Sequence, residues 1–342
     1  MLKLAIISGK ENGSPRVLAE TLNEMVGLSD HSSRVYYNSK AIRRLLSGKE
    51  VKKNPVLWFL YRMLHWLKDR SFFREIRKKD AVILCDWSPH GFYRDSYDIK
   101  EFKRLTKTPV LYYSVQYLGN SPTLIERLKK GGHALQERYD WHLAVSPVTE
   151  LRGTPSPPWS QIGLYMKGAG LNPVPKKEFL AIVDFERKGY EKYREDQINV
   201  LKELDIPFIS LEKSYSLHEI RKLYQQASVF FIQFPEAYGL PIAECLSYGT
   251  YVATPYSSWA MSWRLDEKVE VHGPGKLADC FIVYENPGVL RNTLQKIRSE
   301  FDAAGTPDRV FQSFISNYPS FYYGNIEALN QVFSKLTNRV IS

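Results

Sequence analysis

Short apolar runs alternate with helix-like segments along most of this 342-residue chain. This alternation is typical of parallel α/β sheets, in which buried strands are joined by helices. In the first half the predicted strands are 2–8, 81–86, 110–115 and 142–146, and the predicted helices are 14–26, 55–68 and 123–137. In the second half the predicted strands are 179–183, 207–211, 229–234 and 251–254, and the predicted helices are 190–204, 217–226 and 241–248. The sequence therefore predicts an α/β protein with two doubly wound sheets.

A proline-rich stretch without clear periodicity separates the two series. Residues 153–175 contain five prolines and are predicted to form the junction between domains. A chain of this length suits two domains of about 150 residues each. We expect an N-terminal domain at 1–165, a C-terminal domain at 176–318 and a final aromatic, helical segment at 319–342.

Composition excludes several classes of protein. Hydrophobic residues make up 44% of the chain, so it is neither disordered nor of low complexity. The cysteines have neither the spacing of a zinc site nor the density of a disulfide scaffold, since there are only three of them: Cys85, Cys245 and Cys280. No secretory signal and no apolar run of about 18 residues is visible. We therefore expect a cytoplasmic protein.

The net charge of +10 is concentrated in one segment. Between Lys40 and Lys79 there are 13 Lys and Arg against 3 Asp and Glu, whereas the rest of the chain holds 34 of each sign. Trp58, Phe59 and Trp66 are among the apolar side chains that interleave with these cations. Basic amphipathic helices of this kind lie on anionic membrane surfaces. Residues 40–79 predict either peripheral binding to the inner face of a membrane or a domain helix with solvated cations.

The most specific motif spans residues 234–244, which read FPEAYGLPIAE. A strand, a tight loop and a helix start follow one another there, and Pro241 suits the first helical position. The i, i+3, i+4 spacing of a buried helix face is shared by three residues: Ile242, Cys245 and Leu246. This spacing turns Glu244 away from the buried face, so we expect its carboxylate to be free to face a ligand.

The residue types in this motif suit a nucleotide sugar. Backbone N–H groups around Gly239 and Leu240 point out of the helix N-terminus, where the dipole favours an anion such as a diphosphate. Gly239 lets the backbone approach the ligand closely. Glu244 can accept hydrogen bonds from a vicinal diol such as a ribose, and Glu236 can hold the hydroxyls of a sugar.

The sequence EAYGLPIAE, with two glutamates separated by seven residues, resembles the donor-site motif of retaining glycosyltransferases of family 4. The resemblance covers roughly residues 178–254. It implies the GT-B fold, in which two Rossmann-like domains face a central cleft and the final helix returns to the first domain. It also implies that Glu236 contacts the donor sugar and that Glu244 contacts the nucleotide ribose. Between these two glutamates we expect three further residues to bind the donor: Tyr238, Gly239 and Leu240.

Further site residues follow from the same resemblance. The family has a basic pair that neutralises the donor diphosphate, for which this chain offers Arg187 and Lys188. The Gly-Arg usual just after the strand is absent, since Asp184 and Phe185 occupy that place. The family's nucleobase pocket falls near residues 210–215, where Leu211 and Tyr215 could pack against a base.

The N-terminal half supplies two weaker candidates. Residues 8–15 form a glycine-containing loop that resembles the family's turn facing the donor phosphates, with Gly13 in contact with the donor and Ser14 as the N-cap. The family often has a histidine near the anomeric centre, but Gln116 stands at that position. His90, after another strand, is the remaining candidate for an acceptor-side proton-transfer group.

The predicted activity is transfer of a hexosyl group, with retention, from a nucleotide sugar to a glycan or lipid-linked acceptor, in surface polysaccharide or glycoconjugate biosynthesis. We expect no metal and no cofactor, because no Asp-x-Asp pair lies beside a strand and the histidines do not cluster with carboxylates. A nucleotide-sugar epimerase of GT-B fold is an alternative. A basic nucleic-acid-binding protein is another, although the chain carries no motif of that class and we expect no nucleic-acid partner.

Overall fold

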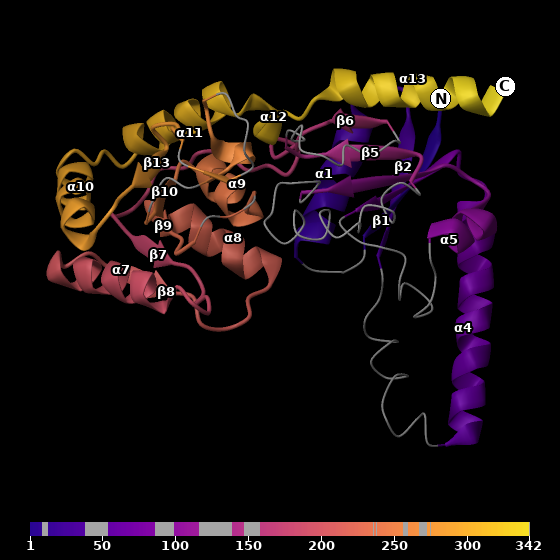
Figure 1. The fold of residues 1–342 in the computed structure, drawn as a ribbon, viewed down its shortest axis with the longest axis horizontal. Coiled ribbons are helices and arrows are strands. Elements are labelled where there is room, and N and C mark those ends of the chain that lie inside the picture. The colour runs from indigo at the N-terminus through magenta and orange to yellow at the C-terminus, as the bar shows by residue number, and fades with distance from the viewer. Residues whose placement is uncertain are drawn as a thin grey trace.

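The structure is a computed structural model of the chain. It describes residues 1–8, 13–37, 54–85, 99–115, 139–146, 158–234, 236, 238–255, 259–266, 272–273 and 275–341. The described elements form two α/β halves, and the last helix runs back along the first half (Figure 1).

The first half is built on six parallel strands. They are β1 (Lys3–Ser8), β2 (Ser32–Tyr37), β3 (Ala81–Cys85), β4 (Val110–Ser114), β5 (Trp141–Ala144) and β6 (Trp159–Gln161), in the spatial order β2-β1-β3-β4-β5-β6. Every residue of β3 is buried, because helices cover both faces of the sheet. Alternate residues of β1 accordingly enter different cores, with Leu4 and Ile6 on one face and Ala5 and Ile7 on the other.

Three helices of this half cover the sheet: α1 (Ser14–Gly27), α4 (Pro55–Ile76) and α5 (Ile99–Thr106). α1 packs on the face of Leu4 and Ile6, whereas the last turns of α4 and the middle of α5 pack on the opposite face through Phe73 and Phe102. The N-terminal turns of α4 project away from the sheet (Figure 1). None of the helices in the described residues is both long enough and apolar enough to cross a membrane.

The second half is built on five parallel strands. They are β7 (Ala181–Val183), β8 (Phe208–Ser210), β9 (Val229–Phe231), β10 (Tyr251–Thr254) and β13 (Phe281–Val283), in the order β13-β10-β9-β7-β8. A small antiparallel pair, β11 (Trp259–Ala260) and β12 (His272–Gly273), stands apart from this sheet, with the 3₁₀ turn η2 (Met261–Trp263) after β11.

Helices also cover both faces of the second sheet. α7 (Glu191–Glu203) and α10 (Pro287–Ser299) pack on the face that carries Val183 and Phe231. α8 (Leu217–Gln226) and α9 (Leu240–Ser247) pack on the face that carries Ile182 and Phe230. The core on this second face is continuous with the core between α1 and the first sheet.

The C-terminal tail links the two halves. α11 (Gly305–Asn317) and α12 (Pro319–Tyr322) lie against α9, and α13 (Ile326–Ile341) lies against β6 of the first sheet. The backbone N–H of Leu164 donates to the carbonyl of Ser320 (2.8 Å). Gly163 has φ +67, and a Cβ there would lie 2.1 Å from the Ser320 oxygen, so only glycine permits this close approach.

Most predicted elements are present, with corrections. The elements that were not predicted include β2, α5, β6, β11, β12, β13 and α10. Of these, β6 lies inside the stretch predicted as the junction between domains. The helix predicted at 55–68 continues to Ile76, and the one predicted at 123–137 lies outside the described residues. Both sheets fall within the predicted ranges 1–165 and 176–318, and the domain boundaries themselves stay a prediction.

Candidate functional site

The carboxyl ends of three neighbouring strands meet at one edge of the second sheet. Val183 of β7 is paired with Ser210 of β8 and with Phe231 of β9. The residues that follow these strands therefore lie together, starting with Asp184, whose N–H donates to the carbonyl of Phe231 (2.9 Å). In doubly wound sheets this edge is where ligands bind.

The loop after β9 leads into α9 through a left-handed glycine. Gly239 is the N-cap residue, with φ +71, a conformation that strains any residue with a Cβ. Pro241 is the second residue of α9, one position beyond the first helical position predicted for it, and the N–H groups of Ile242 and Ala243 both donate to the carbonyl of Gly239. Within the described chain the N–H groups of Gly239 and Leu240 have no hydrogen-bond partner, so both remain available at the helix N-terminus.

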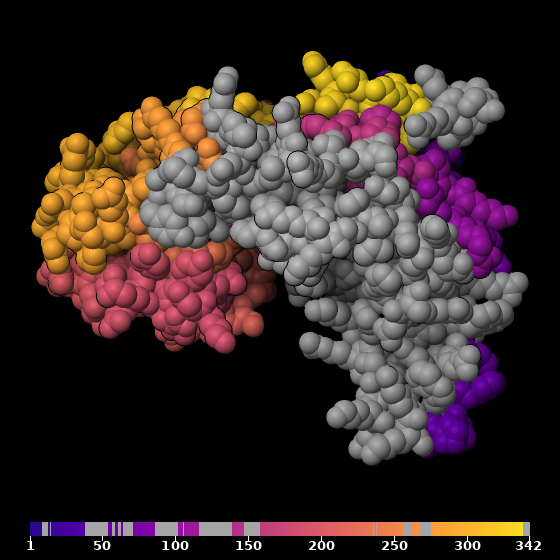
Figure 2. All heavy atoms as spheres, viewed as in Figure 1, coloured from indigo at the N-terminus to yellow at the C-terminus, as the bar shows by residue number. Residues whose placement is uncertain are grey.

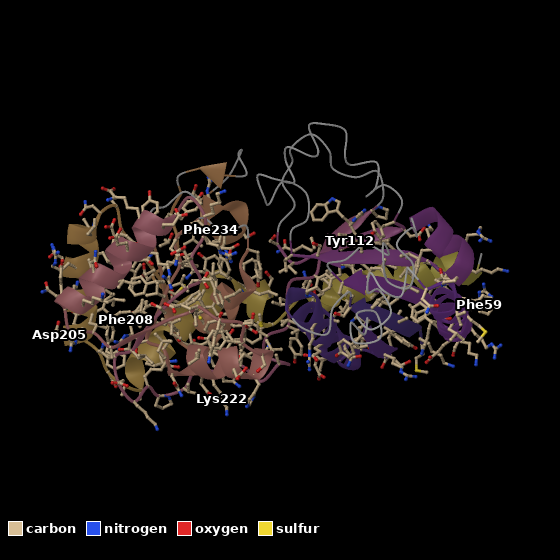
Figure 3. All side chains as sticks on the ribbon, turned by 90° about the horizontal axis from the view of Figure 1, so that it is seen from below. Phe59, Tyr112, Asp205, Phe208, Lys222 and Phe234 are labelled. Atoms are coloured by element: carbon tan, nitrogen blue, oxygen red, sulfur yellow. The ribbon has the colours of Figure 1, made fainter. Side chains whose placement is uncertain are left out.

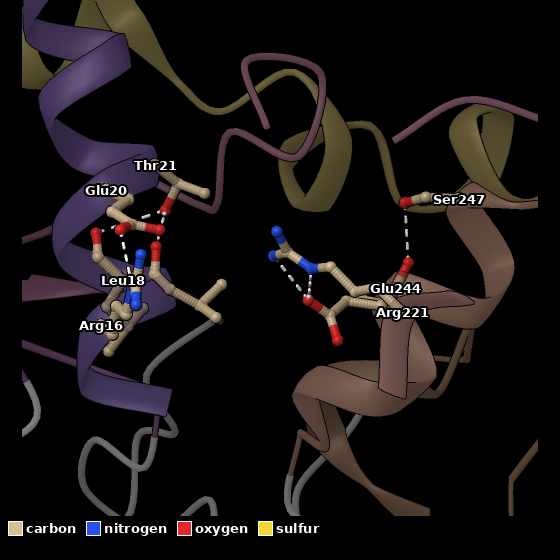
Figure 4. A network of polar contacts seen from close by, with 9 residues as sticks. Arg16, Leu18, Glu20, Thr21, Arg221, Glu244 and Ser247 are labelled. Carbon is tan, nitrogen blue, oxygen red and sulfur yellow. Dashed lines mark hydrogen bonds and ion pairs between the residues drawn. The ribbon is translucent and has the colours of Figure 1, made fainter. Parts of the chain in front are cut away.

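Glu244 lies on α9 and is held by Arg221 of α8 (Figure 4). The Nε and Nη2 atoms of Arg221 lie 2.8 and 2.7 Å from the same carboxylate oxygen, Oε1 of Glu244. Glu244 is 3% exposed, and its burial raises the pKa of the carboxyl, while the guanidinium opposes that rise. The expectation that Glu244 turns away from the buried face of α9 is wrong, because α8, α11 and α12 all pack against this helix and leave Glu244 among its buried residues.

Glu236 lies in the loop after β9, beside a second carboxyl group. Burial and the nearby Asp184 raise the pKa of Glu236 to about 7, and Arg187 opposes the rise. Burial likewise raises the pKa of Asp184 to about 6, against the opposing charges of Arg187 and Arg194. Two carboxyl groups that titrate close to neutrality thus flank one arginine at the sheet edge, an arrangement frequent at functional sites.

The Asp184 backbone is fixed from two sides. Arg194 Nε and Gln233 Nε2 each donate to its carbonyl oxygen, over 3.2 Å in both cases. Two other atoms of the same side chains, Arg194 Nη2 and Gln233 Oε1, are buried without a hydrogen-bond partner in the described chain. One unpaired donor and one unpaired acceptor therefore lie close to Asp184.

The predicted basic pair lies at the surface of this edge. Arg187 and Lys188 are both exposed, in the turn between β7 and α7. The guanidinium of Arg187 lies 5.0 Å from the centre of the Phe234 ring, a cation–π geometry that holds it over the loop carrying Glu236. Figure 3 labels Phe234 on this part of the second half. Arg187 thus belongs to the Glu236 cluster, whereas the structure gives Lys188 no contact with it.

Two of the predicted donor-binding side chains are core residues instead. Tyr238 is 1% exposed, stacks on Trp263 with ring centroids 5.4 Å apart and meets Phe321 edge-on. Leu211 is fully buried, and its N–H extends the sheet by donating to the carbonyl of Val183. Both side chains were expected to contact a donor, and burial by neighbouring aromatic and aliphatic groups corrects that expectation.

Tyr215 remains accessible at the same edge. Its ring is half-buried, with the Phe185 ring centroid 6.2 Å away and the ammonium of Lys213 5.6 Å from its centre. An aromatic surface with a cation beside it suits stacking with a base.

On the first half, Gly13 lies at the start of α1. Gly13 is exposed, has φ +79 and is itself the N-cap, so the prediction that Ser14 caps the helix is wrong. Figure 4 draws the next turn of α1, where Arg16 and Glu20 form an ion pair of 2.7 Å. His90, Gln116 and residues 9–12 of the predicted glycine loop lie outside the described residues.

Arg221, which contacts Glu244, is a residue of this site that the sequence did not single out. The start of its helix, α8, has a local sequence signal, because Ser216 and Glu219 form a capping box there. Its pairing with Glu244, 23 residues along the chain, depends on how α8 packs on α9, for which no local signal exists. Within the described chain, no three His, Cys, Asp or Glu side chains gather as metal ligands would.

No family model matches the sequence, and a search of curated proteins finds no match. Solved structures do match over nearly the whole chain. HepE (Alr3699) of Anabaena, in complex with UDP and glucose, has 12% identity and a TM-score of 0.50, covering 99% of this chain and 100% of its own. The UDP-GlcNAc 2-epimerase of Neisseria meningitidis, bound to UDP-GlcNAc, has 9% identity and a TM-score of 0.52, with coverages of 99% and 100%. MnaA of S. aureus, solved with UDP, has 9% identity and a TM-score of 0.50, with coverages of 99% and 97%.

These likenesses, together with the two parallel sheets, establish the fold class. The chain has the GT-B fold, with two Rossmann-like α/β halves, as the sequence predicted. At identities of 9% to 12% the comparison extends to the fold alone.

Proposed function

We propose that the protein is a glycosyltransferase that takes a hexosyl group from a nucleotide-sugar donor bound at the carboxyl edge of its second sheet. The observation that carries the proposal is the placement of Glu236 and Glu244 on either side of Gly239, at the start of α9. Proteins of the same fold have been solved with UDP or a UDP-sugar, which supports a nucleotide-sugar donor here.

In this proposal each part of the donor has a protein partner. The ribose hydroxyls donate hydrogen bonds to the carboxylate of Glu244, and the base stacks near Tyr215. The diphosphate lies at the N–H groups of Gly239 and Leu240, where the helix dipole favours negative charge. The sugar lies toward Glu236.

The proposed chemistry is electrostatic stabilisation of the leaving nucleoside diphosphate. Arg187, and Lys188 once a donor is bound, would offset the charge that develops on the diphosphate, together with the N-terminus of α9. We propose that no metal and no cofactor take part. As the resemblance to family 4 implies, the sugar would keep its anomeric configuration through attack by the acceptor hydroxyl on the face from which the diphosphate leaves.

The acceptor side is proposed from the sequence. A glycan or lipid-linked acceptor of surface polysaccharide or glycoconjugate synthesis would approach from the first half, with His90 near the reacting hydroxyl.

A screen of donors tests the proposed function. The purified protein is incubated with common UDP-, GDP- and TDP-sugars, and release of the nucleoside diphosphate is measured for each. We expect one sugar to be hydrolysed faster than the rest, and calorimetry with that nucleotide should show binding that Glu244→Ala abolishes or greatly weakens. Equal affinity in wild type and variant would overturn the assignment of the site.

An epimerase is the second candidate, favoured by one observation. Asp184 and Glu236 both titrate near neutrality, as a pair that moves a proton on and off a sugar carbon would need. One experiment distinguishes an epimerase from a glycosyltransferase, because an epimerase forms an isomeric nucleotide sugar without any acceptor. Proton NMR of the donor after incubation with enzyme alone distinguishes this isomer from free sugar.

We further propose that α4 holds the enzyme on an anionic membrane. Four apolar side chains at i, i+3, i+4 and i+7 are exposed along one face of its N-terminal turns: Val56 (66%), Phe59 (66%), Leu60 (43%) and Met63 (43%). Figure 2 shows this end of α4 reaching the lower edge of the molecule, and Figure 3 labels Phe59 at the outer side of the first half. An apolar helix face within a basic segment suits the inner, anionic leaflet, where a lipid-linked acceptor would lie.

A further inference from the structure

Both contacts from Arg221 end on one oxygen of Glu244. Nε donates a hydrogen bond of 2.8 Å to Oε1, and Nη2 forms an ion pair of 2.7 Å with the same atom, so the guanidinium occupies that oxygen. The other oxygen, Oε2, has no hydrogen-bond partner within the described chain and is absent from its buried unpaired atoms, so it retains contact with the surroundings. Figure 4 shows Oε2 pointing away from the guanidinium.

The Arg221–Glu244 pair is largely buried. The Arg221 side chain is 20% exposed and that of Glu244 is 5% exposed. Within the described residues Arg221 bonds to Glu244 alone, so its charge is committed to this carboxylate. Removing the guanidinium would leave a buried carboxyl without a counter-ion, and such a group binds a proton instead of staying charged.

We infer that Arg221 is a positioning residue for nucleotide binding: it holds Oε1 of Glu244 so that Oε2 alone accepts hydrogen bonds from the ribose hydroxyls of a nucleoside diphosphate. The inference rests on the proposed function, and it deepens that function by adding a residue to the same site. A ribose diol supplies two hydrogen-bond donors and Oε2 has two free lone pairs. Oε2 can therefore accept both hydrogen bonds without any contribution from Oε1. Arg221 itself need not touch the ligand.

Lys176, which donates to the carbonyls of Gln225 and Tyr248 at the ends of α8 and α9, has a pKa lowered by burial to about 8 and titrates in the wild type and in the variants alike. The groups that interact electrostatically with Glu244, apart from Arg221, stay neutral over the pH range of the test. Burial raises the pKa of each of them above its ordinary value, and they come from α8, from the loop before α9 and from α9 with its C-cap: Tyr224, Tyr238, Cys245 and Tyr248. Arg221 is the cation that faces Glu244. A pH effect that appears only when Arg221 is replaced therefore reports on Glu244.

The test measures the affinity of UDP and GDP by calorimetry from pH 6 to pH 9. For Arg221→Met we expect affinity at pH 7 to fall on the order of tenfold, since a charged hydrogen-bond network is lost. We also expect that loss to shrink as the pH rises, because Glu244 then gives up its proton and again accepts hydrogen bonds. Arg221→Lys should recover part of the affinity, and Lys222→Met, which removes an exposed charge from the next position of α8, should change little.

A double-mutant cycle completes the test. Glu244→Gln and the double variant Arg221→Met/Glu244→Gln should bind almost equally, because Arg221 acts through Glu244 alone. Additive losses, or a loss in Arg221→Met that is the same at every pH, would overturn the inference. If the wild type binds neither nucleotide, nor TDP, the proposed function itself fails. Thermal unfolding checks that each variant is folded. If Arg221→Met does not fold, the same affinities are measured with Arg221→Lys in its place.

Discussion

The ammonium group of Lys176 donates a hydrogen bond of 2.8 Å to the carbonyl oxygen of Tyr248, at the C-terminal end of α9. It also donates to the carbonyl of Gln225, the penultimate residue of α8, over 2.9 Å. One buried lysine from the segment between the two sheets thus caps both helices that carry the Arg221–Glu244 pair. Its burial lowers the pKa to about 8, which leaves it mostly charged at pH 7.

Replacement of Lys176 with methionine should destabilise the protein by about 2 to 3 kcal/mol, because the buried carbonyl of Tyr248 and the partly buried carbonyl of Gln225 lose their donor. The change keeps most of the apolar stem, so packing is largely conserved. Urea unfolding at pH 7 measures the effect. Lys177→Met, at the exposed neighbouring position, is the control and should leave the midpoint almost unchanged. Equal midpoints for Lys176→Met and wild type would contradict a capping role.

Gly239→Ala should weaken nucleotide binding more than it weakens folding. The new Cβ would adopt a strained φ of +71 and meet Ile242 Cδ1 at 2.7 Å, which shifts the start of α9 and its free N–H groups. Gly170→Ala is the matched control, since Gly170 also has φ +71 but its Cβ would meet nothing within 4 Å. Both variants should lose about 1 to 2 kcal/mol of stability. UDP affinity, measured by calorimetry, should fall only in Gly239→Ala.

Glu236→Gln should stabilise the protein at alkaline pH. The folded pKa of Glu236, about 7, lies above its ordinary value of 4.5, so the folded state binds the proton more tightly than the unfolded state does. The contribution of Glu236 to the free energy of unfolding is therefore fully present below pH 4.5 and is lost as the pH rises through about 7. At pH 8 the variant should be more stable than the wild type by about 2 kcal/mol, and the difference should narrow toward pH 5.

Urea unfolding of wild type and Glu236→Gln at pH 5, 6, 7 and 8 measures how their difference in free energy of unfolding changes with pH. Glu186→Gln removes an exposed carboxyl from the same edge and should show no comparable trend. A difference between wild type and Glu236→Gln that is constant with pH would show that Glu236 titrates at the same pH in the folded and unfolded states.

Reversing four cations of the basic segment should release the protein from anionic vesicles. Lys52, Lys53, Arg62 and Lys68 become Glu, and cosedimentation with phosphatidylglycerol vesicles is compared with neutral phosphatidylcholine vesicles. Each cation near such a surface contributes about 1 kcal/mol, so binding should fall by more than about tenfold. The matched control reverses four exposed cations of the second half, with the same change in net charge: Lys192, Lys202, Lys222 and Lys296. Equal release by both variants would point to net charge rather than to α4.

The elements with complete local signals were predictable from the sequence. α8 was predicted with its observed bounds, because an apolar periodicity follows a capping box at Ser216 and Glu219. β10 was also predicted with its observed bounds, 251–254. β2 was missed because it is an edge strand with half of its side chains exposed, so the sequence SSRVYY carries no apolar run.

The site could be predicted as a location but not as a set of contacts. The loop and helix motif placed Glu236 and Glu244 at one sheet edge, since parallel strands end together. The burial of Tyr238 could not be predicted in this way, because Trp263 and Phe321 reach it from segments 25 and 83 residues further along the chain. The Arg221–Glu244 pair was missed for the same reason, namely that helix–helix packing has no signature in either helix alone.

The return of the tail has a consequence for synthesis of the chain. Leu329, Val332 and Phe333 are fully buried, and Phe333 meets His31 of the first half with ring centroids 4.8 Å apart. α13 is synthesised after both sheets, so Leu22 and Met25, which belong to the same core, are made long before it. The core of the first half is therefore complete only after α13 has been made, and until then a nascent chain exposes apolar surface of that half.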